Sequence, residues 1–239
     1  MSDKACARTE RLIGRAGMVR LAGAHVLVAG LGGVGGQTAE TLARAGVGSL
    51  TLIDGDCVTR SNLNRQVAAL HSTLGRPKSA VITKHITDIN PELLVQARCE
   101  WLTPASLPAL LAAGPYDYVA NCIDGVAAKV ALIAACATRE MPIIASMGAA
   151  GRLDPSRVRL AKLNQTHGDG LARAVRRGLK ARGLRPELSV VFSDEPVRPT
   201  THEAGAGQAA HGVISYLPAL FGLMLGGEII RRLLARETG

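Results

Sequence analysis

The sequence contains few aromatic residues. Phe, Trp and Tyr together make up only 3% of its 239 residues, so it offers little surface on which nucleic-acid bases could stack. Its formal net charge is +9, from 28 Lys and Arg against 19 Asp and Glu. This balance fits a basic protein without a polyanionic partner, and it equally fits a protein that binds a nucleotide or RNA. Any RNA contact would depend mainly on charge.

The five cysteines include no C-x-x-C pair. They are Cys6, Cys57, Cys99, Cys122 and Cys136. An odd number of isolated cysteines argues against a disulfide framework and against a zinc site recognisable from sequence. Cys122 and Cys136 fall among apolar neighbours and are predicted to be core residues. Cys57 lies beside acidic residues, which disfavour a reactive thiolate.

The chain also lacks a recognisable signal peptide and a run long enough to span a membrane. A reducing cytoplasm is therefore the expected location. The most apolar segment, Val213–Leu225, is too short for a comfortable span and contains Pro218. We expect it to form a buried helix, either within one subunit or at an interface between subunits.

Apolar runs typical of strands alternate with helical runs through most of the chain. Strands are predicted at 25–30, 49–54, 94–99, 116–124 and 143–147, and helices at 35–46, 78–90, 105–112 and 126–139. This alternation predicts a doubly wound α/β fold with a mainly parallel, Rossmann-like sheet. After Gly148, strands at 157–163 and 188–192 are predicted to form an antiparallel C-terminal extension. Without an evident linker or repeat, residues 1–239 are predicted to form one domain.

A glycine-rich segment, AGLGGVGGQ, lies between the first predicted strand and the first predicted helix. Its glycines are Gly30, Gly32, Gly33 and Gly35, and three of them spell G-x-G-x-x-G. Such a loop places backbone N–H groups and a positive helix end against phosphate. The motif alone does not distinguish NAD from ATP, or either from a tight turn without a ligand. Asp54, at the end of the next strand, stands where a ribose-binding carboxylate belongs.

Polar residues after the second predicted strand do not suit a dehydrogenase. The segment DGDCVTRSNLNRQ carries Asp56, Asn62 and Arg65, and Lys78 follows near the start of a helix. Arg65 and Lys78 can bind phosphate oxygens, and Asn62 can add an amide. Asp124 ends a predicted strand, where its carboxylate can bind Mg²⁺ beside a triphosphate or cap the next helix.

A basic amphipathic helix is predicted within LARAVRRGLKARGLR. Its apolar face comprises Leu171, Val175, Gly178 and Leu179, and its basic residues off that face are Arg173, Arg176, Arg177 and Lys180. Two interpretations stay open, a solvated surface helix and a helix that contacts RNA phosphates. The segment at 199–212 is rich in Gly, Ala and Thr and is predicted to be a mobile loop. His202 and His211, in or beside it, are given no catalytic role.

The motifs taken together resemble a known superfamily. GLGGVG, DGD, SNLNRQ, GRPKSA and NCID occur in this order within residues 25–150, as in the ubiquitin-activating-enzyme-like adenylating proteins, which include the thiamine and molybdopterin sulfur-carrier activators. The N-terminal RTERLIGRAGMVRLAG, SDEPVRP and GVISYLPALFGLMLGGEII look like the tRNA threonylcarbamoyladenosine dehydratase branch. With these segments the resemblance covers nearly the whole chain. Sulfur-carrier activators commonly bind zinc through two C-x-x-C pairs, which this sequence lacks.

The resemblance implies a binding site for ATP with Mg²⁺, to which a monovalent cation could be added. The nucleotide-binding residues that it implies are Gly30, Gly32, Gly33, Gly35, Asp54, Asp56, Asn62, Arg65 and Lys78. Asp54 would bind the ribose, Arg65 and Lys78 the phosphates, and Asp124 the metal. A catalytic arginine, Arg11 or the nearby Arg8, would reach the ATP site of the partner subunit in a homodimer.

The implied reaction is acyl adenylation. A carboxylate of threonylcarbamoyladenosine in tRNA would attack the α-phosphate of ATP, and the activated carbonyl would then close into a ring with net loss of water. Arg11, Arg65, Lys78 and Asp124 would supply positioning and charge. Two alternatives are an adenylyltransferase that activates the C-terminus of a ubiquitin-like sulfur carrier, and an NAD-dependent oxidoreductase.

Overall fold

The computed structural model describes residues 6–198 and 212–235, which contain one seven-stranded sheet. The strands are β1 (His25–Ala29), β2 (Ser49–Ile53), β3 (Leu94–Arg98), β4 (Tyr118–Asn121), β5 (Ile143–Ser146), β6 (Val158–Lys162) and β7 (Ser189–Ser193). Their spatial order is β3-β2-β1-β4-β5-β7-β6. Every neighbouring pair is parallel except β6 and β7. The C-terminal extension is thus antiparallel only at its outermost strand, because β7 pairs parallel with β5.

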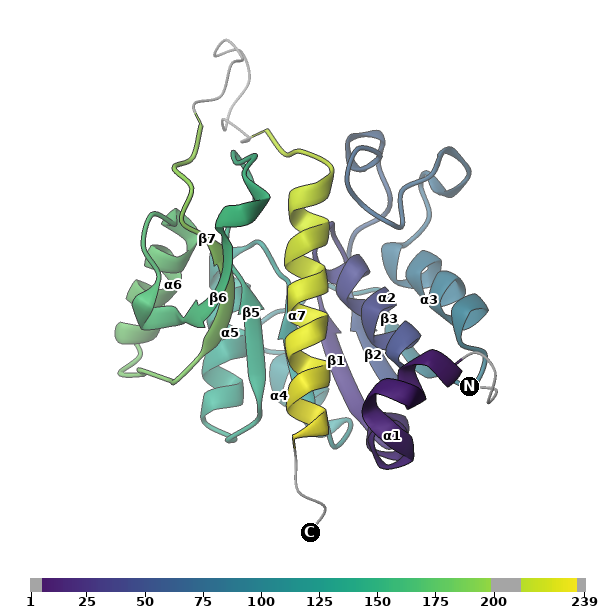
Figure 1. Cartoon of the computed structure of the whole chain (residues 1–239). Coiled ribbons are helices and arrows are strands. Elements are labelled where there is room, and N and C mark those ends of the chain that lie inside the picture. The colour runs from purple at the N-terminus through teal and green to yellow at the C-terminus, as the bar shows by residue number, and fades with distance from the viewer. Residues whose placement is uncertain (1–5, 199–211, 236–239) are drawn as a thin grey trace.

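Helices cover both faces of this sheet (Figure 1). They are α1 (Ala7–Ala22), α2 (Gly35–Ala45), α3 (Lys78–Ile89), α4 (Leu107–Ala112), α5 (Val126–Ala137), α6 (Gly170–Lys180) and α7 (Tyr216–Leu234). Four short 3₁₀ turns lie at Arg60–Asn62, His71–Thr73, Pro155–Arg157 and Leu163–Gln165. Helices α2, α3 and α7 pack on one face, and α4, α5 and α6 on the other. The predicted doubly wound fold is confirmed.

The central strand β1 shows why its sequence is apolar throughout. Val26 and Val28 face the core under α2 and α7, whereas Leu27 and Ala29 face the core under α4 and α5. All four side chains are fully buried. A strand covered on both faces by helices has no polar side, so the usual strand alternation disappears.

The apolar C-terminal segment forms α7, which begins at Tyr216 and continues to Leu234, beyond the predicted end at residue 225. Phe221, Leu225 and Ile229 are buried in the core that α7 shares with α2. The two helices approach closely at Gly222, where a Cβ atom would lie 2.4 Å from the backbone oxygen of Val34, the N-cap residue of α2. One face of the predicted helix is therefore buried within its own subunit, while Tyr216 and Leu223 on this helix are exposed. No helix in the described residues is long and apolar enough to cross a membrane.

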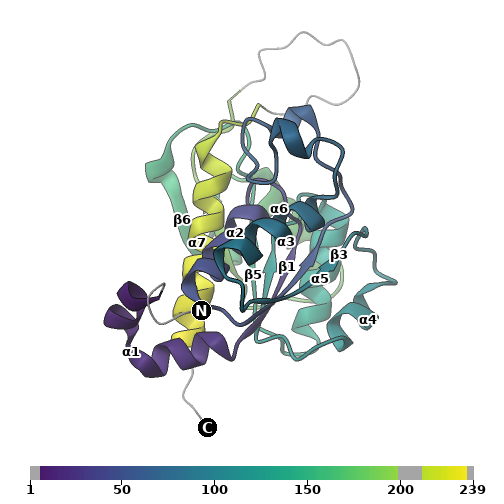
Figure 2. The same cartoon turned by 90° about the vertical axis from the view of Figure 1, so that its right-hand side faces the viewer.

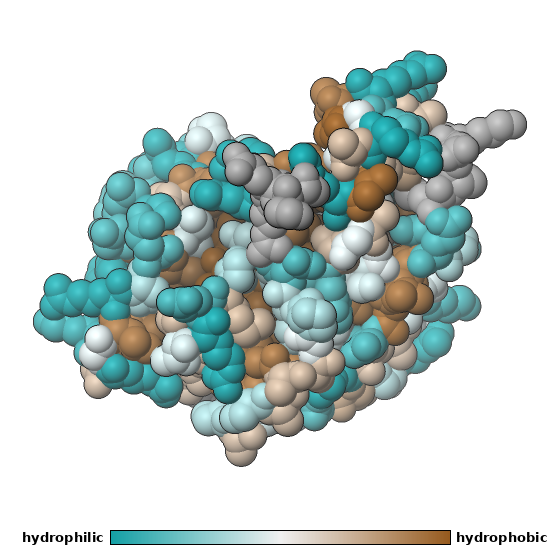
Figure 3. Space-filling model, turned by 90° about the horizontal axis from the view of Figure 1, so that it is seen from below, coloured by the Kyte–Doolittle hydropathy of each residue, from teal (hydrophilic) through white to brown (hydrophobic). Residues whose placement is uncertain are grey.

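Helix α1 has no counterpart among the predicted elements. It is broken at Gly14, whose φ of 72° and ψ of 170° are not helical. Its second half packs on the body through Leu21, whereas its first half projects outward with Leu12 85% exposed (Figure 2). Seen from below, the projecting part of the molecule carries both hydrophobic and hydrophilic side chains (Figure 3). Val19, in the second half, is also exposed.

Candidate active site

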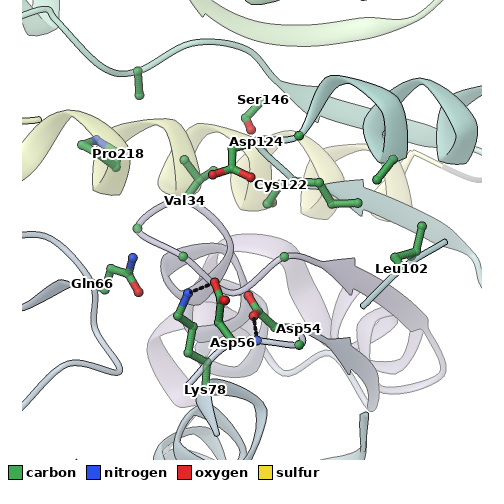
Figure 4. Close-up of a pocket in the computed structure, with 18 of the residues that line it drawn as sticks. Val34, Asp54, Asp56, Gln66, Lys78, Leu102, Cys122, Asp124, Ser146 and Pro218 are labelled. Atoms are coloured by element: carbon green, nitrogen blue, oxygen red, sulfur yellow. Dashed lines mark hydrogen bonds and ion pairs between the residues drawn. The ribbon is translucent and has the colours of Figure 1, made fainter. Parts of the chain in front are cut away.

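A cavity of about 770 Å³ opens at the carboxyl ends of the central strands. It lies across β1 and β4, where the chain connections diverge, which is the usual ligand position in open α/β sheets. The β1–β3 wall consists of residues 30, 32–34, 53–56, 62, 65, 66, 78 and 100–102. The β4–β5 wall consists of residues 122–128, 146–150, 171, 213 and 218. Asp124 and Ser146 face Asp54 and Asp56 across this space (Figure 4).

The glycine loop forms the middle of the β1–β3 wall. Gly30 has a φ of 87°, and its Cβ would lie 3.0 Å from the backbone of Cys122. At Gly35 a Cβ would lie 1.7 Å from the carbonyl oxygen of Gly30, so only glycine allows the turn into α2. Gly30, Gly32 and Gly33 line the cavity, whereas Gly35 lies behind them. Gly35 thus shapes the loop and does not face a ligand.

Asp54 joins the end of β2 to this loop. Its Oδ2 accepts a hydrogen bond of 2.6 Å from the backbone N–H of Leu31, and its Oδ1 accepts one of 2.8 Å from that of Asp56. Each carboxylate oxygen has a second lone pair, so the side chain can still accept from ribose hydroxyls. Asp54 therefore holds the loop and lines the cavity at once.

Lys78 and Asp56 form an ion pair in the cavity wall, with 2.7 Å between Nζ and Oδ2 (Figure 4). Lys78 is the first residue of α3, after Pro77, and only 6% of its side chain is exposed, against 45% for Asp56. A buried ammonium needs a negative partner. Asp56 supplies it here, and a phosphate oxygen could replace or share that partner.

Asn62 and Arg65 come from the 3₁₀ turn that follows β2 and the residues after it. Asn62 is buried, and its Oδ1 accepts a hydrogen bond of 3.1 Å from the Thr59 N–H. Arg65 donates from Nη1 to the Ser61 carbonyl at 2.7 Å and to Asn64 Oδ1 at 2.8 Å. These bonds hold both side chains at the cavity, and Arg65 keeps its Nε and Nη2 donors for a ligand.

Among the described residues, Asp124 is the only carboxylate that lines the β4–β5 wall. It lies three residues beyond the end of β4, because that strand ends at Asn121 and not at 124 as predicted. Gly125 is the N-cap of α5 and no side-chain capping bond is formed, so the alternative role of Asp124 as a helix cap is wrong. The described residues contain no cluster of three potential metal-binding side chains. A Mg²⁺ ion at Asp124 would take its other ligands from phosphate and water.

Arg11 is not brought to the cavity of its own chain. It lies exposed on the projecting half of α1, which also carries Arg8. Helix α1 leads into the amino end of β1, whereas the cavity is at the carboxyl end (Figures 1 and 2). An arginine from α1 could therefore act only at the site of another chain.

Sequence reasoning missed a buried lysine beneath the β4–β5 wall. Lys129 is fully buried in α5, and its Nζ donates to the carbonyls of Ser146 at 2.8 Å and Asn121 at 3.2 Å. Burial lowers the pKa of this amine to about 8, against the opposing effect of nearby acidic groups. A single charge within the apolar run VAAKVALIAACA was the available sequence indication.

Trp101 is a second residue that sequence reasoning did not single out. It is the only tryptophan of the chain, it follows β3, and it lines the cavity with 67% of its surface exposed. Its ring lies over Gly55, where a Cβ atom would stand 2.7 Å from the nearest ring carbon. The missing side chain at Gly55 makes room for an aromatic surface at this end of the cavity.

The cysteines of the described residues provide no reactive thiol in this cavity. Cys122, predicted as core, lines it, but burial raises the pKa of its thiol to about 11. Cys136 is fully buried, as predicted, and burial raises its pKa to about 12. Cys57 is exposed, forms a backbone bridge with Pro77 and does not line the cavity.

The basic helix α6 begins at the cavity and leads away from it. Leu171, in its first turn, lines the β4–β5 wall, and Arg173, Arg177 and Lys180 are exposed. Arg176 is different, because its Nη1 donates to the carbonyl oxygens of Leu163 and Thr166 at 3.1 Å each, and to the hydroxyl of Thr166. Of the four basic residues predicted off the apolar face, Arg176 is therefore bound within its own chain. His202, His211 and most of the predicted loop at 199–212 lie outside the described residues.

The model of the ThiF family matches residues 6–239. The chain belongs to the ThiF family. It is 37% identical over 238 residues to the tRNA threonylcarbamoyladenosine dehydratase of Bacillus subtilis, in a match that covers 95% of this chain and 93% of that protein. It is 40% identical over 173 residues to the dehydratase of Escherichia coli, covering 72% and 64% of the two chains.

A solved structure gives the same relationship in three dimensions. The E. coli tRNA N6-threonylcarbamoyladenosine dehydratase in complex with ATP superposes with a TM-score of 0.90 and 33% identity, covering 98% of this chain and 95% of that one. The predicted family resemblance is confirmed, and the ThiF-family chain has the expected fold along nearly its full length.

Proposed function

We propose that this ThiF-family protein is an ATP-dependent tRNA threonylcarbamoyladenosine dehydratase that acts in the cytoplasm. The observation that supports this most directly is the cavity itself. It combines a glycine loop, the carboxylate of Asp54 and the cations Lys78 and Arg65 in a fold that matches an ATP-bound dehydratase over 98% of this chain. Two cations beside a glycine loop suit a triphosphate better than the less charged pyrophosphate of a redox dinucleotide.

The residues that line the cavity support one direction for bound ATP. Asp54 would bind the ribose at the end of β2, which directs the base toward β3 and Trp101. The phosphates would follow the glycine loop toward Lys78 and Arg65 and extend to Asp124 on the opposite wall. Mg²⁺ held by Asp124 would neutralise charge on the phosphates.

The reaction then needs positioning and charge neutralisation from the protein. A carboxylate oxygen of the threonyl group attacks the α-phosphorus, the bond to the bridging oxygen breaks, and pyrophosphate leaves with the negative charge. A nucleophile within the same substituent then attacks the activated carbonyl, loses its proton and expels AMP, which retains the carboxylate oxygen. The modified nucleoside has lost the elements of water, and no protein thiol takes part.

The position of α1 supports a homodimer with composite sites. Arg11 projects away from its own cavity on a helix that also exposes Leu12 and Val19. In a dimer, the partner chain would bury these apolar side chains. Arg11 would then reach the phosphates of the ATP molecule that the partner chain binds. The guanidinium would then stabilise the charge that develops on the leaving pyrophosphate.

Helix α6 supports tRNA binding beside the cavity. Arg173, Arg177 and Lys180 are exposed, and no acidic residue occurs within Gly170–Lys180. Contacts from such side chains to phosphates give affinity without base recognition, which suits a chain poor in aromatic residues. Leu171, in the first turn of α6, lines the β4–β5 wall, so the proposed tRNA-binding surface would lie directly beside that wall.

Mass spectrometry of tRNA nucleosides tests the proposal. We expect tRNA carrying the linear modification to lose the mass of one water when incubated with the protein, ATP and Mg²⁺, and to stay unchanged without ATP. The Asp124→Ala protein serves as the matched enzyme control. An unchanged nucleoside, together with ATP-dependent adenylation of a sulfur carrier's C-terminus, would replace this function by the carrier-activating alternative.

A further inference from the structure

A buried ionic network lies behind the β4–β5 wall and does not face the cavity. Arg152, Asp169 and Glu195 are 2%, 2% and 6% exposed. Asp169 precedes α6, Arg152 follows the loop after β5, and Glu195 follows β7 in the SDEP motif. None of the three lines the cavity, and none has a role in the binding of ATP described above.

Asp169 connects the cavity wall to α6. Its Oδ2 accepts a hydrogen bond of 3.0 Å from the N–H of Gly148 and pairs with Arg152 Nη1 at 3.2 Å. Its Oδ1 accepts one of 2.8 Å from the N–H of Ala172 and so caps the helix. One carboxylate therefore holds Gly148 of the wall and the first turn of α6 in a fixed relation.

Arg152 and Glu195 hold the rest of the wall loop. Arg152 donates from Nη1 to the Gly148 carbonyl, from Nη2 to the Gly168 carbonyl at 3.3 Å, and from Nε to the Glu195 carbonyl at 2.9 Å. The Glu195 Oε2 accepts from the N–H groups of residues 153 and 154 at 2.9 and 2.7 Å. The loop is thus anchored on both sides of Arg152 by charged groups that water does not reach.

The wall needs such support because, apart from Asp124, it contains little that can orient a substrate. Between Ser146 and Ala150 it consists of small or apolar residues and backbone, and Leu171 adds an apolar contact. The nucleoside of ATP would occupy the β1–β3 wall, so an acyl group that attacks the α-phosphorus must lie against the β4–β5 wall. A displacement of about 1 Å at the reacting atoms can lower a rate by two orders of magnitude.

We propose that Asp169 is a positioning residue that holds the Gly148–Ala150 segment of the cavity wall in register with α6. RNA bound along α6 and the acyl group in the cavity belong to one molecule, so the two surfaces must keep a constant relation. This inference rests on the proposed function for its substrate and on the contacts of Asp169 for its geometry. A buried ion pair adds little net stability compared with apolar packing, which favours a positional role.

The first test compares Asp169→Asn with Asp194→Asn. Asparagine keeps the size of Asp169 and can still cap α6, but it loses the charge and one acceptor. Asp194 is the matched control, because its carboxylate is 9% exposed and pairs with Arg157 and Arg159 away from the cavity. We expect Asp169→Asn to lower kcat for water loss by about tenfold or more, with the Kd for ATP changed by less than about twofold. Asp194→Asn should change neither.

The second test measures the coupling without any substrate. In Asp169→Asn, amide hydrogen exchange should increase together at residues 146–151 and 170–175, and Asp194→Asn should not reproduce this pattern. Unchanged exchange at both segments would show that Asp169 does not couple the wall segment to α6.

Equal losses of kcat and ATP affinity in Asp169→Asn would also contradict the proposal, because they would indicate general damage to the protein. If the wild-type protein removes no water from the tRNA, the proposed function fails while the exchange result still decides the role of Asp169.

A third variant covers the case in which Asp169→Asn does not fold. The double change Arg152→Met with Asp169→Asn removes both members of this ion pair, so neither is left buried without its partner. It should fold and show the same joint increase in exchange at the wall and at α6. A folded double variant with wild-type exchange and wild-type kcat would refute the proposal.

Discussion

On the β1–β3 wall the charged side chains point into the cavity, whereas on the β4–β5 wall most of them are enclosed behind it. Lys78 and Asp56 pair directly at the cavity surface. Arg152, Asp169 and Lys129 are buried beneath or behind the opposite wall, where they bind backbone carbonyl and N–H groups. The two walls have similar charged residue types but use them for different purposes.

This difference separates two physical tasks. A triphosphate is a flexible polyanion, and side chains that can exchange partners, such as Lys78 leaving Asp56, suit its binding. An acyl group that must attack one phosphorus atom needs a wall that does not move, and buried charges fixed to backbone provide that rigidity. Loss of a charge on the first wall should therefore affect ATP binding, and loss of a charge behind the second should not.

The largest effect is expected at Lys78. If changing Lys78 had no effect on ATP binding, the proposed difference between the charges of the two walls would be wrong. Lys78→Ala removes the phosphate-binding cation and leaves Asp56 without its partner, so adenylation should fall by roughly 10²–10³-fold. Substrate-dependent release of pyrophosphate measures this loss, and calorimetry should show weaker ATP binding. Lys84→Ala, an exposed change on the same helix, is the control that should keep the wild-type rate. If Lys78→Ala binds ATP as tightly as wild type, Lys78 does not contact the phosphates.

The second effect concerns residues from two chains at one site. Arg11→Ala and Asp124→Ala should each abolish most adenylation, the first by loss of the partner's arginine and the second by loss of metal binding. After subunit exchange, half of the dimers are mixed and each has one intact site, so about a quarter of wild-type activity should return. Differently tagged chains verify the exchange. An inactive mixture after proven exchange would show that Arg11 does not complete the partner's site, and Arg8→Ala would then be tested in the same way.

A smaller effect is expected on α6, where the charges lie outside both walls. Changing Arg173, Arg177 and Lys180 to Ala should weaken tRNA binding and flatten its logarithmic salt dependence by about one for each phosphate that is no longer bound, with ATP binding unchanged. Arg176→Ala should instead lower the melting temperature, because it breaks bonds to Leu163 and Thr166. A triple variant with the wild-type salt dependence would make α6 a solvated surface helix.

The sequence predicted the β1–β3 wall far better than the β4–β5 wall, for a physical reason. Phosphate binding needs glycines, a carboxylate and cations at fixed short spacings, so the segments from Gly30 to Lys78 can be recognised locally. The pairing of Asp169 with Gly148 and Arg152 joins residues that are 21 and 17 positions apart and meet only in the folded chain. The strand and helix periods do not encode such a contact.

The fold was predictable to a similar extent and with similar limits. Alternation of apolar runs indicated the order of elements, but not the end of β4 at Asn121, whose carbonyl accepts a hydrogen bond from Lys129 of the next helix. The projecting half of α1 lacks a continuous apolar face, and Gly14 interrupts it, so its period was not recognised.

The smallest expected effect concerns Lys129. The pH dependence of stability tests whether this charge beneath the β4–β5 wall is buried. Burial lowers its pKa to about 8 in the folded protein, below the ordinary lysine value of 10.5. Between these values the unfolded chain binds more protons than the folded one, so this lysine makes stability rise as pH rises. Its contribution changes by at most about 1.4 kcal/mol per pH unit. Urea unfolding of wild type and Lys129→Met between pH 7 and about 10.5 measures it.

The quantity to compare is the difference in the free energy of unfolding between the two proteins, because both contain the other titrating groups. The buried thiol of Cys122, whose pKa is raised to about 11, has the opposite pH dependence and interacts with Lys129. The difference is therefore most direct below about pH 9, where this thiol is protonated in the folded state of both proteins. The free energy of unfolding of wild type minus that of Lys129→Met should increase from about pH 8 upward. A difference that stays constant over this range would mean that Lys129 is not desolvated.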